Sequence, residues 1–225
     1  MYKIRLGGIR IVGTLDGDMK HTLLTVSLLS AAAALSAQSA GSPKMSYDFI
    51  RAGYVQGEEI RGVGISGTAL LGEYVLIGGS YQDLTARNLD DVDGEANTVN
   101  LGARFGVGSG DIIISASYGQ LQAGGVDGGS AVALAANVTS LGFAYRHSFN
   151  DMWEAFVSYD RVRTEYGAGS VDLYSGDAYI GAASQSDNMF GVAVRCNVTK
   201  EFDVTAGYSW VDGEGALSIS AGYNF

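Results

Sequence analysis

The sequence predicts an all-β fold, a transmembrane antiparallel up-and-down β-barrel, and three observations predict it. After residue 45, apolar and polar residues alternate with period two in runs typical of membrane-barrel strands. The chain contains 33 Gly and one Pro, a composition too rich in glycine for a helical bundle. Beyond residue 40 no apolar run approaches the roughly 20 residues that a spanning helix needs.

Residues 19–40 are expected to be a signal peptide. The segment Met19-Lys20-His21 is short and cationic, and residues 22–35 are mostly apolar. Small residues follow at 36–40, as signal peptidase requires, so we expect cleavage between Ala37 and Gly41. A buried core helix is the alternative, but it would need neither the cationic start nor the small residues. Residues 1–18 are then a non-native upstream extension, and residues 41–225 form the barrel.

The last strand shows the alternation most clearly. Leu217, Ile219, Ala221, Tyr223 and Phe225 share one face, whereas Ser218, Ser220, Gly222 and Asn224 share the other. The same pattern predicts ten strands, at 46–57, 60–70, 74–84, 98–107, 111–122, 138–147, 152–165, 188–197, 202–211 and 215–225. Eight strands is the alternative if 46–70 is divided differently.

The connections between these strands fall into two classes. Short links lie at 71–73, 108–110, 148–151 and 198–201, and long ones lie at 85–97, 123–137 and 166–187. Two tight acidic links, 58–59 and 212–214, complete the set. Membrane barrels of bacterial outer membranes have short periplasmic turns and longer extracellular loops. The division into short and long links therefore places the short links and both ends of the mature chain on the periplasmic side.

The residue types on the two faces predict which one meets lipid. Seven glycines lie on the polar face, at 78, 102, 119, 142, 191, 207 and 222. They would leave the core of a soluble, lipocalin-like barrel hollow, but they suit a narrow lumen crossed by long charged side chains. The apolar face carries two groups of aromatic residues near the strand ends, as bilayer interfaces select. They are Tyr54, Tyr81, Tyr118, Tyr159 and Trp210 toward the long loops, and Phe105, Tyr145, Trp153, Phe202, Tyr223 and Phe225 toward the short turns.

Charged residues on the inward parity predict a lumen network. Its members are Arg51, Arg104, Arg146, Arg195, Asp111, Glu154 and Asp203. Three pairs flank periplasmic turns, namely Arg104/Asp111, Arg146/Glu154 and Arg195/Asp203. Because unpaired charges in a narrow lumen are costly, we expect reciprocal pairing. A purely structural network is the favoured interpretation, and a charged gate in a small pore is the alternative.

Arg161 and Arg163 fall on the lipid-facing parity near the outer rim. Guanidinium groups pair well with phosphates, so contact with lipopolysaccharide is one interpretation. Ordinary snorkelling toward the headgroups is the other.

Several other patterns do not predict chemistry. The G-x-G-x-x-G match at residues 62–67 lacks the helix that a dinucleotide site needs. His147 is the single histidine after the signal and lies beside a short turn, so we expect no hydrolytic enzyme. The acidic stretch 90–95 lacks the ligand spacing of a calcium loop, and we expect neither a metal nor a cofactor. With 24 acidic against 14 basic residues, binding of nucleic acid is not expected.

The opening Ser46–Val55 and the ending Ser220–Phe225 resemble the small OmpA/OmpX-like outer-membrane barrel family. The resemblance covers the mature chain as a pattern, without an invariant motif. It implies a monomer in the bacterial outer membrane, in contact with its lipids and lipopolysaccharide. It also implies that Tyr223 and Phe225 help the barrel-assembly machinery recognise the chain. No peptidoglycan-binding domain follows, so we expect a non-enzymatic structural or surface-interaction role, with a narrow porin-like channel as the alternative.

Overall fold

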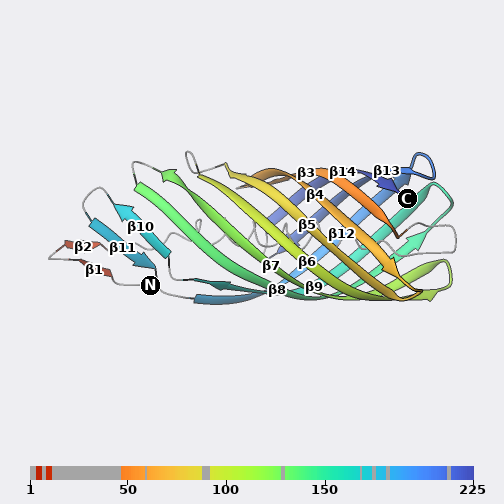
Figure 1. The fold of residues 1–225 in the computed structure, drawn as a ribbon, viewed down its shortest axis with the longest axis horizontal. Helices are drawn as coiled ribbons and strands as arrows, with labels where there is room; N and C mark the ends of the chain where they lie inside the picture. Colours follow the sequence, from red (N-terminus) through yellow and green to blue (C-terminus); the bar gives the residue numbers. More distant parts are fainter. Residues whose placement is uncertain are drawn as a thin grey trace.

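The computed structural model describes residues 4–6, 9–11, 47–58, 60–87, 92–127, 130–167, 169–173, 176–180, 183–211 and 214–225. Within these residues, ten strands form one closed antiparallel barrel (Figure 1). They are β3 (Phe49–Gly57), β4 (Ile60–Leu71), β5 (Val75–Ala86), β6 (Val92–Val107), β7 (Gly110–Asp127), β8 (Ser130–Ser148), β9 (Trp153–Tyr166), β12 (Ala183–Asn197), β13 (Phe202–Val211) and β14 (Glu214–Asn224). The prediction of ten strands is confirmed, and the alternative of eight is wrong.

Each barrel strand pairs with the barrel strands before and after it in the chain, and β9 pairs with both β8 and β12, because the β10–β11 segment lies between β9 and β12 in the sequence. The ladder between β14 and β3 closes the sheet, with Ser220 opposite Gly53 and Ala221 opposite Ala52. The strands run obliquely to the long axis (Figure 1), as closure of a sheet into a barrel requires. Because the sheet is closed, each barrel strand has a hydrogen-bonded neighbour on both sides over the length that the ladders share.

The two ends of the barrel differ. At the turn end, the links are short, at 72–74, 108–109, 149–152 and 198–201, and the C-terminal residue lies there (Figure 1). Gly72 and Gly108 adopt φ of 67° and 65°, the left-handed region that favours glycine in tight turns. The opposite, loop end carries the hairpin of β10 (Gly169–Leu173) and β11 (Gly176–Ile180). β10 continues the sheet by pairing with residues 131–133 of β8.

The N-terminal predictions fall mostly outside the described residues. β1 (Ile4–Leu6) and β2 (Ile9–Ile11) form a separate antiparallel pair. The expected signal peptide, 19–40, and its cleavage region lie outside the described part. Among the described residues, no helix has the length and apolar character needed to cross a membrane.

The predicted strand limits are too short at the loop end. β6 already begins at Val92, and β7 and β8 stay paired as far as Asp127 and Ser130. The sequence expected long connections at 85–97 and 123–137. Toward the loop end the polarity of the two faces reverses, because Val92 and Ala96 of β6 are buried inside the barrel while Asp93 and Glu95 are exposed outside. A search for an apolar outer face therefore locates the membrane band and misses the paired strands above it.

The orientation of the two faces agrees with a membrane barrel. Large apolar side chains point outward, among them Val99, Leu101 and Leu141, each about 60% exposed. The glycines of the polar face point inward and are buried or half-buried. Soluble monomers rarely expose so large a continuous apolar surface. The predicted aromatic residues of both groups also lie on the outer face, and apart from half-buried Tyr145 they are exposed.

Closure of the barrel can be tested at Ile219, whose backbone lies between Tyr54 of β3 and Ala206 of β13. We expect Ile219→Pro to abolish the folded form, because proline removes a ladder donor from a central strand. Ile219→Val keeps an aliphatic, lipid-facing side chain and serves as the control. On a gel with unheated and heated samples, wild type and Ile219→Val should shift on heating, whereas Ile219→Pro should not. A heat-induced shift in all three proteins would contradict this account of closure.

Candidate functional site: the lumen of the barrel

The lumen at the turn end is crossed by a set of charged side chains. Arg146, near the end of β8, and Glu154, at the start of β9, face each other across one short turn. Arg146 Nε donates a hydrogen bond to Glu154 Oε2 at 2.8 Å, and Arg146 Nη2 contacts the same oxygen. Asn197 Nδ2 donates to the other carboxylate oxygen at 2.9 Å. Both charged side chains are at most 1% exposed, so the pair is isolated from water.

A second pair spans strands that are not neighbours. Arg51 of β3 donates from Nη2 to Asp203 Oδ2 of β13 at 3.1 Å, across the intervening strand β14. Gly222 of β14 makes this approach feasible. A Cβ atom at Gly222 would lie 2.8 Å from both Arg51 Nε and Asp203 Oδ2. The missing side chain therefore provides the space that the ion pair occupies.

Arg195 of β12 links the two pairs. Its Nη1 lies 3.6 Å from Glu154 Oε2, and its Nε lies 3.7 Å from Asp203 Oδ1. Charged side chains thus form a continuous array from β8 through β9, β12 and β13 to β3. Asp111 is fully buried and is the cross-strand neighbour of Arg146. Among the described residues four carboxylates are buried, those of Asp111, Glu154, Asp160 and Asp203, and Glu154 and Asp203 form the ion pairs with the three buried arginines.

Two aromatic rings fill the space beside the arginines. The guanidinium carbon of Arg51 lies 4.2 Å from the ring centroid of Phe49, and that of Arg195 lies 5.7 Å away. Arg146 and Arg195 are each 5.2 Å from the ring of Phe156. Cation–π attraction gains strength when the groups are removed from water. The lumen plug, as we call this unit, consists of Arg51, Arg146, Arg195, Glu154, Asp203, Phe49 and Phe156.

The arrangement of the plug differs in part from the predicted pairs. Arg146 meets Glu154, as predicted, but Arg195 is shared between two carboxylates, and the closest arginine contact of Asp203 is to Arg51. The prediction used adjacency at turns, and it could not know that a narrow lumen brings non-neighbouring strands together. Half-buried Arg104 donates to the Glu73 carbonyl at 2.9 Å and lies over the Tyr47 ring. Its pairing with Asp111 stays a prediction.

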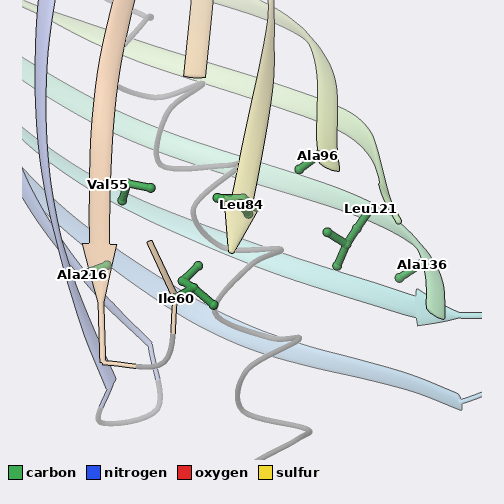
Figure 2. Close-up of a cluster of buried hydrophobic side chains, with 7 residues drawn as sticks. All are labelled: Val55, Ile60, Leu84, Ala96, Leu121, Ala136 and Ala216. Carbon is green, nitrogen blue, oxygen red and sulfur yellow. The ribbon is translucent and has the colours of Figure 1, made fainter. Parts of the chain in front are cut away.

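Above the plug the lumen changes character twice. The middle layer is polar, with hydroxyl contacts of 2.7 Å between Ser80 and Thr98 and between Ser117 and Ser140, and it also holds the buried side chains of Asn100 and Asp160. At the loop end, seven consecutive strands of the sheet each contribute one apolar side chain to a cluster. This aliphatic collar comprises Val55, Ile60, Leu84, Ala96, Leu121, Ala136 and Ala216 (Figure 2). The sequence analysis missed it by treating the inward parity as uniformly polar, although Leu84 shares that parity with Gly78.

The remaining predicted residues lie on the outside or at the turn end. Arg161 and Arg163 point outward from β9, toward the loop end. Tyr223 and Phe225 are exposed at the turn end, and the Tyr223 ring packs on Phe202 at 5.2 Å. His147 lies 3.3 Å from the hydroxyls of Ser109 and Tyr145, also at the turn end. Residues 62–67 lie inside β4, where they cannot form a phosphate-binding turn.

Solved structures similar to this chain are outer-membrane β-barrels. The translocator domain of the autotransporter NalP from Neisseria meningitidis aligns at a TM-score of 0.58 and 12% identity, covering 93% of this chain and 100% of that one. KdgM porin in complex with disordered oligogalacturonate gives 0.43 and 11%, covering 79% and 99%. The N-terminal β-barrel domain of Pseudomonas aeruginosa OprF gives 0.38 and 16%, covering 79% and 96%.

The sequence itself matches no protein-family model and no curated protein. At such low identities the structural likeness establishes the barrel fold alone. It assigns no activity, and the resemblance to the OmpA/OmpX-like family stays a prediction.

The plug can be tested through Glu154, which contacts two of its arginines. We expect Glu154→Gln to lower the free energy of unfolding by about 3–5 kcal/mol, because buried arginine charge loses its compensation. Glu165→Gln is the matched control, because it removes only an exposed ion pair with Arg163, worth about 0–1 kcal/mol. Urea unfolding in detergent micelles measures both values. Equal losses in the two variants would contradict a stabilising plug.

The close approach at Gly222 gives a steric test. We expect Gly222→Ala to lower the free energy of unfolding by about 1–3 kcal/mol, because the added methyl group displaces the Arg51–Asp203 pair. Gly106→Ala is the control, since the nearest atom to its Cβ would be Asp111 Oδ1 at 3.6 Å, an ordinary contact. The same urea titration compares the two, and a Gly222→Ala variant as stable as Gly106→Ala would show that the pair is not closely packed.

Proposed function

We propose that this chain is a non-enzymatic bacterial outer-membrane barrel with a sealed lumen and a structural or surface-interaction role. The observation that carries the proposal is the lumen plug, which draws on five of the ten strands. Export through a signal peptide at 19–40, with the turn end facing the periplasm, belongs to the same proposal. Assembly through the terminal aromatic residues Tyr223 and Phe225 belongs to it as well.

Burial of the plug supports a seal. Each of its three arginines is at most 2% exposed, and each contacts both a carboxylate and an aromatic ring. A path for ions would keep such groups hydrated, because moving a charge out of water is expensive. The plug therefore favours the structural interpretation over the gate.

The aliphatic collar supports a second barrier at the other end of the lumen. Its side chains carry no group that can replace the hydration shell of an ion, and apolar constrictions in pores can exclude water. The collar and the plug lie at opposite ends of the polar middle layer. Loss of one barrier then leaves the other in place.

A narrow passive channel for small solutes is the second candidate, and the middle layer favours it. A lumen built only for stability would be filled with apolar side chains, as soluble barrels are. Here serine, threonine and glycine line the centre, including the Ser80–Thr98 and Ser117–Ser140 contacts. If the plug rearranged, those groups would line a hydrophilic path.

Planar-bilayer recording separates the two candidates. We expect the refolded wild-type barrel to give no conductance steps, and Arg146→Ala to give none either, because the collar remains. Arg161→Ala, which removes the same charge from the outer surface, is the control. Steps in the wild type would favour the channel. Steps that appear only in Arg146→Ala would identify the plug as a gate.

A further inference from the structure

A row of aromatic rings crosses the outer surface of β9, β12 and β13 near the loop end. Tyr159, Phe190 and Trp210 lie opposite one another in the strand register. The Phe190 ring is 5.1 Å from Tyr159 and stacks on Trp210 at 5.8 Å, and Tyr208 lies 6.0 Å from Trp210. We call these four residues the aromatic platform. All four are partly exposed on the outward-facing surface, and aromatic rings are favoured at bilayer interfaces.

Two arginines follow the platform on the same face, one and two strand repeats nearer the loop end. Arg161 Nη1 donates to Asn188 Oδ1 at 2.8 Å, and the Tyr159 hydroxyl donates to the same oxygen at 2.8 Å. Arg163 Nη2 pairs with Glu165 Oε1 at 2.8 Å. These bonds connect Arg161 to the platform through Asn188 and hold it against the wall of the barrel.

The arginines keep donors for a ligand. Within the described part of the chain, Nη1 is the Arg161 atom that donates to Asn188, so Nε and Nη2 can donate to a ligand. The Arg163–Glu165 pair is more than half exposed, and such pairs contribute little energy, so a stronger acceptor can replace the carboxylate. On the lipid-facing wall, the anions within reach are those of the headgroups.

We propose that Arg161 and Arg163, above the aromatic platform, bind the phosphate of an outer-leaflet lipid such as the lipid A part of lipopolysaccharide. The inference rests on the outer-membrane location in the proposed function. Residues two apart on a strand are separated by roughly 6.6 Å, so both guanidinium groups can reach one phosphorylated headgroup. Planar guanidinium donors match phosphate oxygens in pairs. The platform rings then meet the sugar and the upper acyl chains.

The alternative is snorkelling, in which each arginine merely reaches water. The two explanations require different geometries of the side-chain donors. Snorkelling needs only a charge on a flexible stem, so lysine would serve as well. A bidentate phosphate site would be weakened by lysine, which is a point charge.

The test uses the refolded barrel in detergent micelles, titrated with diphosphorylated lipid A and followed by native mass spectrometry. We expect Arg161→Ala/Arg163→Ala to weaken binding about tenfold or more. Arg161→Lys/Arg163→Lys should recover only part of the loss. Lys200→Ala, which removes a charge at the opposite rim, should bind like wild type, and lipid A without phosphates should not distinguish wild type from the alanine variant.

Three results would overturn the proposal. They are equal binding by wild type and the alanine variant, full recovery by the lysine variant, and competition by inorganic phosphate as strong as that of lipid A. Heat-modifiability of each variant verifies that it is folded. A failed lipid test with a heat-modifiable, non-conducting barrel leaves the proposed function intact. Conductance by the wild type would overturn the seal without affecting this site.

Discussion

The ladder between β14 and β3 is the interaction on which the rest of the structure depends. Hydrocarbon offers no partner for a backbone N–H or C=O group, so a sheet in a bilayer must close on itself. Closure fixes ten strands around one axis and separates the two faces of every strand. Outward residues such as Leu101 and Leu141 then meet lipid, while the opposite parity is confined to a narrow interior.

Confinement explains the chemistry of the interior. An arginine in a narrow lumen must find a carboxylate, and the carboxylate within reach is not always on the adjacent strand. Arg51 therefore reaches across β14 to Asp203, and Gly222 leaves the space for it. Arg195 divides its contacts between Glu154 and Asp203 because it lies between them. The rings of Phe49 and Phe156 fill the remaining space and exclude the water that would otherwise solvate the charges.

The lumen and the outer wall both carry arginine residues, and the charge of these residues is compensated differently on the two faces. Inside, arginine charge is compensated by protein carboxylates and is fully buried. Outside, Arg161 and Arg163 remain exposed, and their compensation can come from the membrane itself. The same residue type thus supports a seal on one face and, as we propose, a lipid contact on the other. The face of the strand on which the arginine lies, toward the lumen or toward the lipid, decides between the two roles.

The sequence alone determined the fold class and the strand count, because period-two alternation, with Leu217 and Ile219 against Ser218 and Ser220, reports directly which face meets lipid. It also located the charged residues of the lumen. Only the tertiary structure decided their partners, since the Arg51–Asp203 contact depends on strand order, tilt and the width of the lumen. The aliphatic collar and the tall loop-end hairpins were likewise hidden. The collar breaks the expected polarity at single positions such as Leu84, and above the membrane the polarity of the two faces reverses, with Ala96 buried inside and Glu95 exposed outside.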